Sequence, residues 1–328
     1  PNGARWDRND DRRTVTLNGL TAALFSILSA VSLLAQQTEE PKPVKLPFVE
    51  DFEDSGWSSR GWYDGPAIET TDETSFQGKR ACVWNWKQKG ETTAAGKGGR
   101  VLFEPTENVT LSFAMKHSDN WTWTGVDWHP HEMHFMTTKD TPFWGPAYTY
   151  LTLYIEVVNG VPRCAMQDSR NIDTTALGKD LTAVTEKRAV AGGNGDPDGH
   201  GKGGYYKSGR DYRNGRDFAA DSVYFSDRKG PRYKGDWHHV EAYFKMNSIA
   251  NGKAVKDGQV SYWYDGKLVI NQNNVVLRTG ARANMKFNQF VIAPWMGEGS
   301  PVDQTFWVDN LSVHTERPSG GTGSGSGT

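Results

Sequence analysis

The sequence lacks the features that mark several large classes of protein. Its 328 residues include only two cysteines, Cys82 and Cys164, so it is not a disulfide scaffold. The formal net charge is −2, which argues against a nucleic-acid binder or a membrane-surface protein. No internal repeat is visible, which argues against a propeller or solenoid, and long amphipathic helical patterns are missing. The two cysteines fit either one disulfide or two buried thiols.

Glycine and aromatic residues are abundant instead. The chain has 36 glycines, 13 tryptophans and 12 tyrosines, and 36% of its residues are hydrophobic. This apolar content suffices for a large core, and the glycines fit a chain with many turns. Aromatic-rich all-β secreted domains often use exposed rings to stack on sugars, although most rings belong to the core.

The two ends differ in composition from the middle of the chain. Arginines precede an apolar run at 20–35, and small residues end it, as in a secretory signal peptide. The run is shorter than the roughly 20 residues that span a bilayer, which favours export with cleavage near Ala35 over a transmembrane anchor. We therefore expect a signal-peptide region at 1–37, a linker at 38–45, one folded domain at 46–315 and a flexible Gly/Ser tail at 316–328. The protein is expected to be secreted, extracellular or periplasmic.

Short segments with period-two alternation fill most of residues 46–315. The clearest is a hairpin at 237–267, in which apolar residues such as Val240 and Phe244 alternate with polar ones before an Asp265-Gly266 turn. Further strands are expected at 46–51, 79–87, 100–103, 109–117, 131–138, 148–158, 161–168, 286–294 and 305–313. Many short strands with turn signals between them predict an all-β fold, a two-sheet antiparallel β-sandwich of the jelly-roll type.

A long irregular stretch at 173–234 interrupts these strands. Within it, residues 202–234 carry nine Lys and Arg against four Asp, an excess of +5 in a chain of net charge −2. Loops of this length are usually functional or disordered. The local positive charge suits a polyanionic partner, whereas the alternative is a solvated loop whose charges only keep it soluble.

The densest ionisable cluster reads DWHPHEMH, from Asp127 to His134. On a regular strand, His131 would share one face with Met133, and His134 would share the other with Glu132. Imidazoles act as general bases near neutral pH or as metal ligands, although no third metal ligand can be identified. Polar residues at the start of a strand are the alternative. We take His131 and His134 as candidate catalytic residues.

Three segments carry a resemblance to a known family: FEDSGW near the start, WHHVEAYFKMN…DGQVSYWYDGK, and the closing FWVDNLSV. They resemble the concanavalin-A-like jelly-roll superfamily, in particular its branch of alginate, glucuronan and heparin lyases and laminin-G-like modules. The resemblance covers 46–315 and implies the fold rather than the activity, because the superfamily includes lyases, glycoside hydrolases and non-catalytic sugar binders. It also implies that the 237–267 hairpin belongs to the sheet away from the substrate groove.

Two departures from the family pattern bear on activity. Retaining hydrolysis needs two carboxylates about 5 Å apart, and the E-x-D-x-x-E run of the related glucanases is missing here. A hydrolase would need carboxylates from different strands. The lyases also carry Tyr, Lys and Tyr at alternate positions of a late strand, where Asn288, Phe290 and Ile292 stand in this sequence. For this reason we transfer no catalytic residue from the family.

β-Elimination on a uronate needs a cation for the carboxylate, a base for the proton beside it and an acid for the leaving oxygen. His131 or His134, Tyr206 and Arg210 supply these three roles in the sequence. The candidate substrate-binding residues lie on the polar face of the 148–158 strand and in the basic loop: Tyr150, Tyr154, Glu156, Lys207 and Arg213. A polar face opposite an apolar one is also what any half-exposed strand shows.

The resemblance suggests one metal site. Asp51 or Glu53 near the start and Asp309 near the end belong to strands that pair in many jelly rolls. With backbone carbonyls they are candidate ligands for a structural Ca²⁺, which takes six to eight oxygens. The alternative is that they are turn-capping acids.

The sequence as a whole favours a secreted, lyase-like enzyme that cleaves an acidic, uronate-containing polysaccharide. The alternatives are a non-catalytic carbohydrate-binding or adhesion module and a glycoside hydrolase with unrecognised carboxylates. The expected partner is an extracellular, anionic polysaccharide, with no nucleic acid and no membrane beyond the export signal.

Overall fold

The computed structural model describes residues 41–63, 68–90, 98–127, 129–138, 149–167 and 217–319. Within these ranges the regular structure is almost entirely β, and the helical elements are two short 3₁₀ turns, η1 (Trp57–Arg60) and η3 (Gly280–Arg282). No helix in these ranges is long and apolar enough to cross a membrane. The predicted signal peptide, the start of the linker and residues 320–328 of the tail lie outside the described residues.

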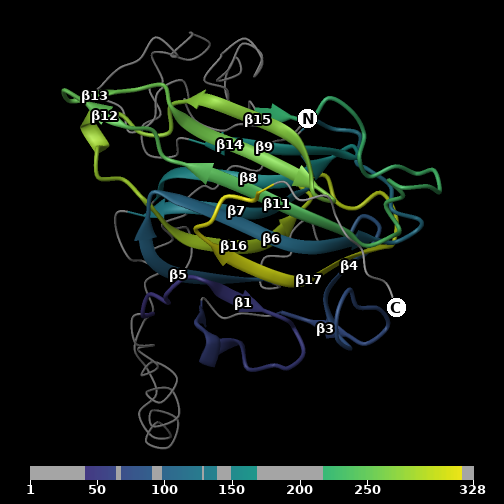
Figure 1. Ribbon diagram of the computed structural model, residues 1–328. Coiled ribbons are helices and arrows are strands. Elements are labelled where there is room, and N and C mark those ends of the chain that lie inside the picture. Colours follow the sequence, from purple (N-terminus) through teal and green to yellow (C-terminus); the bar gives the residue numbers. More distant parts are fainter. Residues whose placement is uncertain are drawn as a thin grey trace, which may run out of the picture. The chain divides into compact units, whose positions relative to one another are not determined.

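Two large antiparallel sheets are layered one over the other (Figure 1). The first sheet runs in the order β15 (Lys267–Val275), β14 (Gly258–Tyr264), β11 (His238–Lys245), β6 (Asn108–His117), β17 (Gln304–His314), β4 (Ala81–Trp86) and β3 (Thr70–Thr71), with β1 (Phe48–Glu50) also paired to β17. The second sheet runs in the order β10 (Asp217–Ala219), β9 (Val161–Gln167), β8 (Thr149–Val158), β7 (His131–Thr138), β16 (Phe287–Trp295), β5 (Gly99–Thr106) and β2 (Trp62–Tyr63). A small ribbon, β12 (Ile249–Ala250) with β13 (Lys253–Ala254), stands apart. The predicted β-sandwich is confirmed.

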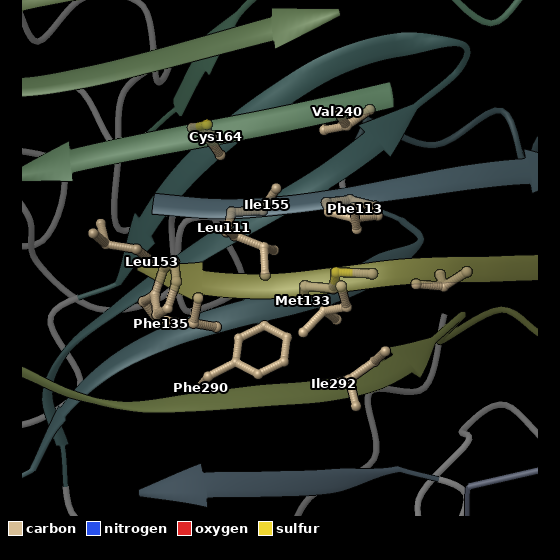
Figure 2. Packing of buried hydrophobic residues seen from close by; sticks show 14 of the residues in the cluster. Leu111, Phe113, Met133, Phe135, Leu153, Ile155, Cys164, Val240, Phe290 and Ile292 are labelled. Carbon is tan, nitrogen blue, oxygen red and sulfur yellow. The ribbon is translucent and has the colours of Figure 1, made fainter. Parts of the chain in front are cut away.

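The core fills the space between the two sheets. Figure 2 shows buried side chains of both sheets in one cluster, among them Phe113 and Val240 of the first sheet and Met133, Phe135 and Phe290 of the second. All five side chains are at most 1% exposed. Burial of one such side chain is worth about 1.5–3 kcal/mol, so the apolar face of each strand drives the sheets together. The opposite face of each strand is thereby left for polar residues.

The predicted hairpin is confirmed, with β11 and β14 paired antiparallel and Val240 opposite Tyr264. Asp265 (φ 47°) and Gly266 (φ 73°) both lie in the left-handed region, which Asp-Gly turns adopt readily. The turn leads directly into β15, a strand that the sequence interpretation missed. This edge strand is mostly exposed and polar, so it carries little hydrophobic alternation.

The two cysteines lie in different sheets. Cys82 belongs to β4 and Cys164 to β9, and both are free and buried. The structure therefore matches two buried thiols, and not a disulfide. Burial raises the pKa of both thiols, which keeps them protonated and unreactive.

Candidate active site

The candidate site lies on the outer face of the second sheet, where β7, β8 and β9 run side by side. Along β8, Leu153 and Ile155 point into the core, so the residues between them face outward. The strand pairing sets Tyr154 opposite His134 of β7 and Glu156 opposite Arg163 of β9. This alternation was predicted from the sequence for Tyr154 and Glu156 and is confirmed.

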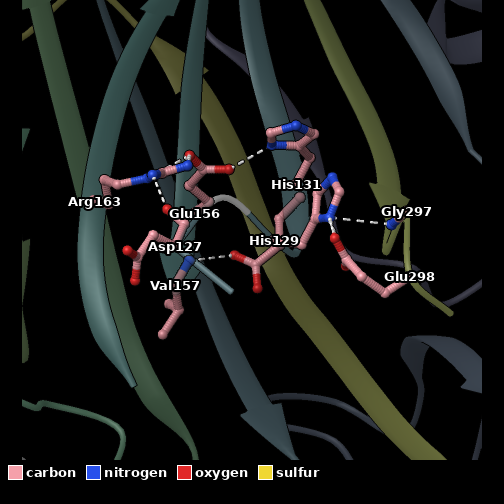
Figure 3. A network of polar contacts seen from close by, with 9 residues as sticks. Asp127, His129, His131, Glu156, Val157, Arg163, Gly297 and Glu298 are labelled. Carbon is pink, nitrogen blue, oxygen red and sulfur yellow. Dashed lines mark hydrogen bonds and ion pairs between the residues drawn. The ribbon is translucent and has the colours of Figure 1, made fainter. Parts of the chain in front are cut away.

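Glu156 joins an imidazole to a guanidinium (Figure 3). Its Oε2 lies 2.7 Å from Nδ1 of His131, and its Oε1 accepts hydrogen bonds from Nε (2.8 Å) and Nη2 (2.6 Å) of Arg163. Arg163 also donates to the backbone carbonyl of Asp127. The Glu156 carboxylate is 1% exposed, and such a buried charge is stable only when paired and hydrogen-bonded.

The Glu156 contact orients the ring of His131. An ionised carboxylate only accepts hydrogen bonds, so Nδ1 of His131 carries the proton in this pair. Nε2 is then the basic nitrogen of the ring, and a positive charge on the imidazole is stabilised by Glu156. An imidazole that a carboxylate holds in a fixed orientation is a common form of general base.

Tyr154 lies between two imidazoles. Its ring centroid is 4.6 Å from that of His131 and 4.6 Å from that of His134, and the two imidazoles are 6.2 Å apart. His131 and His134 therefore share one face, and the prediction that they lie on opposite faces was wrong. The pairing of β7 with β16 is irregular at this point, with a register shift between Ile292 and Trp295 beside His131, so the regular alternation on which the prediction rested does not hold there.

Glu132 lies on the core side of the sheet, and not with His134 as predicted. Its carboxylate is 3% exposed and accepts a hydrogen bond from the backbone N–H of Val157 at 3.1 Å. Burial, followed by the charge of Glu156, raises its pKa well above the usual range. Burial, and then the nearby Glu132 carboxyl, raises the pKa of Tyr262, a core residue of the first sheet. Glu132 and Glu156 therefore do not flank one surface groove as a hydrolase pair would.

A second histidine–carboxylate pair borders the site. Nδ1 of His129 lies 2.7 Å from Oε2 of Glu298 and 3.2 Å from the backbone N of Gly297, and its ring centroid is 4.9 Å from that of His131 (Figure 3). His129 is buried at 6% exposure. Sequence reasoning missed Glu298, since it lies far away in the chain and no pattern links it to His129.

Arg163 was also missed, although a signal for it exists. The β8–β9 connection is the two-residue turn Asn159-Gly160, with φ values of 52° and 77°. A two-residue hairpin fixes the register of its strands, and counting back from this turn places Arg163 directly opposite Glu156.

The structure does not describe the side chains of five other predicted site residues. Tyr206, Lys207, Arg210 and Arg213 lie outside the described residues, and only the backbone of Tyr150 is described, in β8. The proposed convergence of Tyr206 and Arg210 with the two histidines therefore stays a prediction.

The late strand β16 carries Phe290 and Ile292 on its core face. Phe290 and Ile292 are fully buried core residues, so they cannot line a groove. Gln289 points to the other face, where its side-chain amide donates to the hydroxyl of Tyr63.

The candidate calcium residues hold a loop in the structure. Oε1 of Glu53 accepts from the backbone N–H groups of Lys79 (2.8 Å) and Arg80 (3.0 Å), and these bonds lower the pKa of Glu53. Oδ2 of Asp309 accepts from Phe76 (2.7 Å) and Gln77 (3.0 Å).

Asp51 accepts a hydrogen bond from the backbone N–H of Glu53 at 3.2 Å. In the part of the chain that the structure describes, no group of three or more His, Cys, Asp or Glu side chains is arranged to hold a metal ion. A structural Ca²⁺ at Asp51, Glu53 and Asp309, with backbone carbonyls as further ligands, stays a prediction. As they stand, Glu53 and Asp309 act as acceptors for backbone amides.

Comparison with known proteins gives a fold-level match. No family model matches the chain, and no curated protein matches it. Among solved structures, the marine PL-14 alginate lyase from Aplysia kurodai is 12% identical with a TM-score of 0.50, over 82% of this chain and 98% of that one. The endo-β-1,4-glucuronan lyase from Trichoderma reesei is 14% identical with a TM-score of 0.49, over 82% of this chain and 95% of that one. At this identity, the likeness to the Aplysia kurodai structure is one of fold, and it agrees with the predicted resemblance at that level.

Proposed function

We propose that this protein is a lyase-like enzyme that cleaves an acidic, uronate-containing polysaccharide by β-elimination. The observation that carries the proposal is His131, whose Nδ1 is held by Glu156 while its ring lies against Tyr154. This arrangement offers a base and an acid on one face of a sheet. The alginate lyase fold supports the reaction class, but at 12% identity it assigns no residue.

His131 is the proposed base. Nε2 takes the proton from the carbon beside the uronate carboxylate, and the imidazolium that forms is stabilised by Glu156. Arg163 balances the charge of Glu156 through two hydrogen bonds to Oε1. Glu156 and Arg163 are positioning residues in this scheme.

Tyr154 is the proposed acid. As the bond from carbon to hydrogen breaks, the electron pair forms a carbon–carbon double bond and the glycosidic oxygen leaves. The Tyr154 hydroxyl gives its proton to this oxygen, and His131 later returns the abstracted proton to Tyr154 directly or through solvent. The net reaction consumes no water and no cofactor. His134, on the other side of Tyr154, helps to fix the tyrosine ring.

A cation must neutralise the uronate carboxylate before its neighbouring proton becomes acidic enough to leave. Arg163 is already engaged by Glu156, so we keep Arg210 for this role, with Lys207 and Arg213 as substrate-binding residues and Tyr206 as a second candidate acid. Export through the signal peptide and a structural Ca²⁺ belong to the same proposal.

The test is a substrate screen with site variants. The protein is offered alginate, glucuronan, heparin, pectin and neutral glucans, with and without Ca²⁺, and the near-ultraviolet absorbance of new double bonds is followed. We expect absorbance on an acidic polymer, a loss of about a hundredfold or more in His131→Gln and Tyr154→Phe, and little change in His239→Gln. His239 is the matched control because it lies on the first sheet, bonded to Ser112.

Two other outcomes would contradict the proposal. New reducing ends without double bonds would indicate a hydrolase. Retention on a polymer without either product would indicate a binding module.

A further inference from the structure

A short basic loop, residues 222–233, lies between β10 and β11 and rests on the β8–β9 turn. The backbone N–H groups of Tyr224 and Phe225 both donate to the carbonyl of Gly160, at 2.8 and 3.0 Å. Inside the loop, Ser226 N–H donates to Arg232 O (2.6 Å), and Lys234 N–H donates to Ser226 O (3.0 Å). These bonds give the loop a fixed shape and anchor it to the turn that leads into Arg163.

The loop lines an open cavity of about 390 Å³, whose charged lining side chains are all cations. Arg228, Lys229 and Arg232 line it together with Ser226, Val223 and Pro231, and no carboxylate is among the lining residues. The volume falls in the range of small-molecule sites, roughly 300–1,000 Å³, and is sufficient for one sugar residue. Three cations around such a hollow attract an anionic group.

The cations are partly prepositioned by aromatic rings. The guanidinium of Arg232 lies 3.9 Å from the ring centroid of Tyr224, and Nη1 donates to the carbonyl of Val223 at 2.8 Å. Lys229 lies 3.7 Å from the ring centroid of Tyr233, and its ion pair with the exposed Asp119 is long, at 3.7 Å. Because each of these side chains already lies against a ring, it loses less conformational entropy when it binds a ligand.

Arg228 is the lining cation whose guanidinium is best able to bind a ligand. Its backbone N–H donates to the hydroxyl of Ser226 at 3.0 Å, and its guanidinium makes no ion pair with any residue that the structure describes. The nearest acid in sequence, Asp227, is occupied by the buried Lys234. A planar guanidinium is well suited to bind a carboxylate or a sulfate through two parallel hydrogen bonds.

We propose that this cavity is an anion-binding subsite for a charged sugar residue of the polysaccharide. The ligand group is a carboxylate or a sulfate, which share the same recognition chemistry. The loop rests on Gly160, and this turn joins the strands that carry Glu156 and Arg163, so the subsite lies at the same end of the second sheet as the candidate active site. The inference rests on the proposed function for its polymer, but it concerns binding and not bond cleavage.

The test compares two double variants with equal loss of charge. Arg228→Gln with Lys229→Gln removes two of the three cavity cations, and Lys253→Gln with Lys256→Gln removes two exposed cations of the β12–β13 region. Dissociation constants are measured at low salt for a polyuronate, a sulfated glycan and a neutral glucan. We expect about tenfold weaker binding of the acidic polymer for the cavity variant, and less than about twofold for the control.

Each outcome separates this inference from the proposed elimination. Equal weakening by both double variants, or unchanged binding, would overturn the subsite even if double bonds still form. Selective weakening in the cavity variant supports the subsite even if no double bond forms on any polymer. A larger loss for the polyuronate than for the sulfated glycan assigns the carboxylate as the ligand, and the reverse assigns the sulfate.

Discussion

At the residue scale, Glu156 contributes both to stability and to the proposed reaction. Glu156→Gln removes the charge that pairs with buried Arg163, and breaking such a pair costs about 3–5 kcal/mol. It also removes the carboxylate that orients His131. We expect lower stability in urea and about a hundredfold lower elimination rate per folded molecule.

A second variant separates the two effects of Glu156. The double variant Glu156→Gln with Arg163→Met no longer leaves an unpaired buried cation, so its stability is expected to recover at least in part. The rate is expected to stay low, because His131 still lacks its carboxylate. Recovery of the rate together with stability would show that Glu156 acts only through the fold.

His117 is a buried imidazole whose two ring nitrogens have no hydrogen-bond partner among the residues that the structure describes. Rings surround it, with the centroid of Trp121 at 4.5 Å and that of Phe306 at 5.4 Å. Burial, then the positive charges of Lys234 and His238, lower its pKa well below 6.5. The carboxylates on this side are those that pair with these cations, Asp227 with Lys234 and Asp265 with His238.

The pH dependence follows from this low pKa of His117. The unfolded chain takes up a proton near pH 6.5 and the folded chain does not, so the free energy of unfolding falls as pH drops below about 6.5. We expect His117→Phe to raise stability by about 1–3 kcal/mol and to reduce this loss at low pH. Urea unfolding at pH 7.5 and pH 5 measures both, with His239→Phe as the control. An unchanged pH dependence would contradict this account of His117.

At the scale of elements, strands with strong alternation were predictable and polar ones were not. β6, β11, β14 and β17 each carry an apolar face in the core, and the amino-acid pattern alone locates them. β15 was missed because its residues are mostly exposed, and β2 and β3 because they are only two residues long. Period-two alternation is also a poor guide where strand pairing is irregular, as it is between β7 and β16 beside His131, which was assigned to the wrong face.

The loop at 72–80 depends on a carboxylate from a distant strand. Asp309 is 1% exposed and accepts backbone N–H bonds from Phe76, Gln77 and Asn310. Asp309→Ala leaves these donors without their acceptor, and we expect a loss of about 2–3 kcal/mol in stability. Asp303→Ala is the control, since this exposed acid accepts a backbone bond from Gln88 and is expected to cost less than about 1 kcal/mol.

Thermal unfolding of the same Asp309 variant with Ca²⁺ or with a chelator tests the metal prediction. A Tm that rises with Ca²⁺ in the unaltered protein, and no longer does so in Asp309→Ala, would support calcium binding at this corner. If Asp309→Ala lowers Tm by the same amount in Ca²⁺ and in chelator, Asp309 acts as an amide acceptor alone.

At the scale of the whole molecule, the sandwich holds its two thiols apart. Cys82 and Cys164 are free, buried and in different sheets. We expect neither to react with a thiol reagent in the native protein, both to react in denaturant, and a reductant to leave Tm unchanged. Fast labelling of the native protein would contradict the described packing.

The whole-molecule prediction from sequence reached the fold but only part of the site. Composition and strand alternation were sufficient for a β-sandwich, and the polar face of β8 was sufficient for Tyr154 and Glu156. The pair His129–Glu298 was out of reach, because it joins segments that only the folded sheet brings together. The pattern of apolar and polar residues predicts which face of a strand each side chain lies on. Contacts between strands depend on the register of their pairing and on bulges, which the pattern does not give.

The most direct test of the central claim is the mass of the oligosaccharides released from the acidic polymer on which the protein acts. Elimination at the His131–Tyr154 site predicts fragments whose new non-reducing ends are one water lighter than the products of hydrolysis, and it predicts that Tyr154→Phe releases few of them. Fragments that carry the full mass of added water would contradict the account.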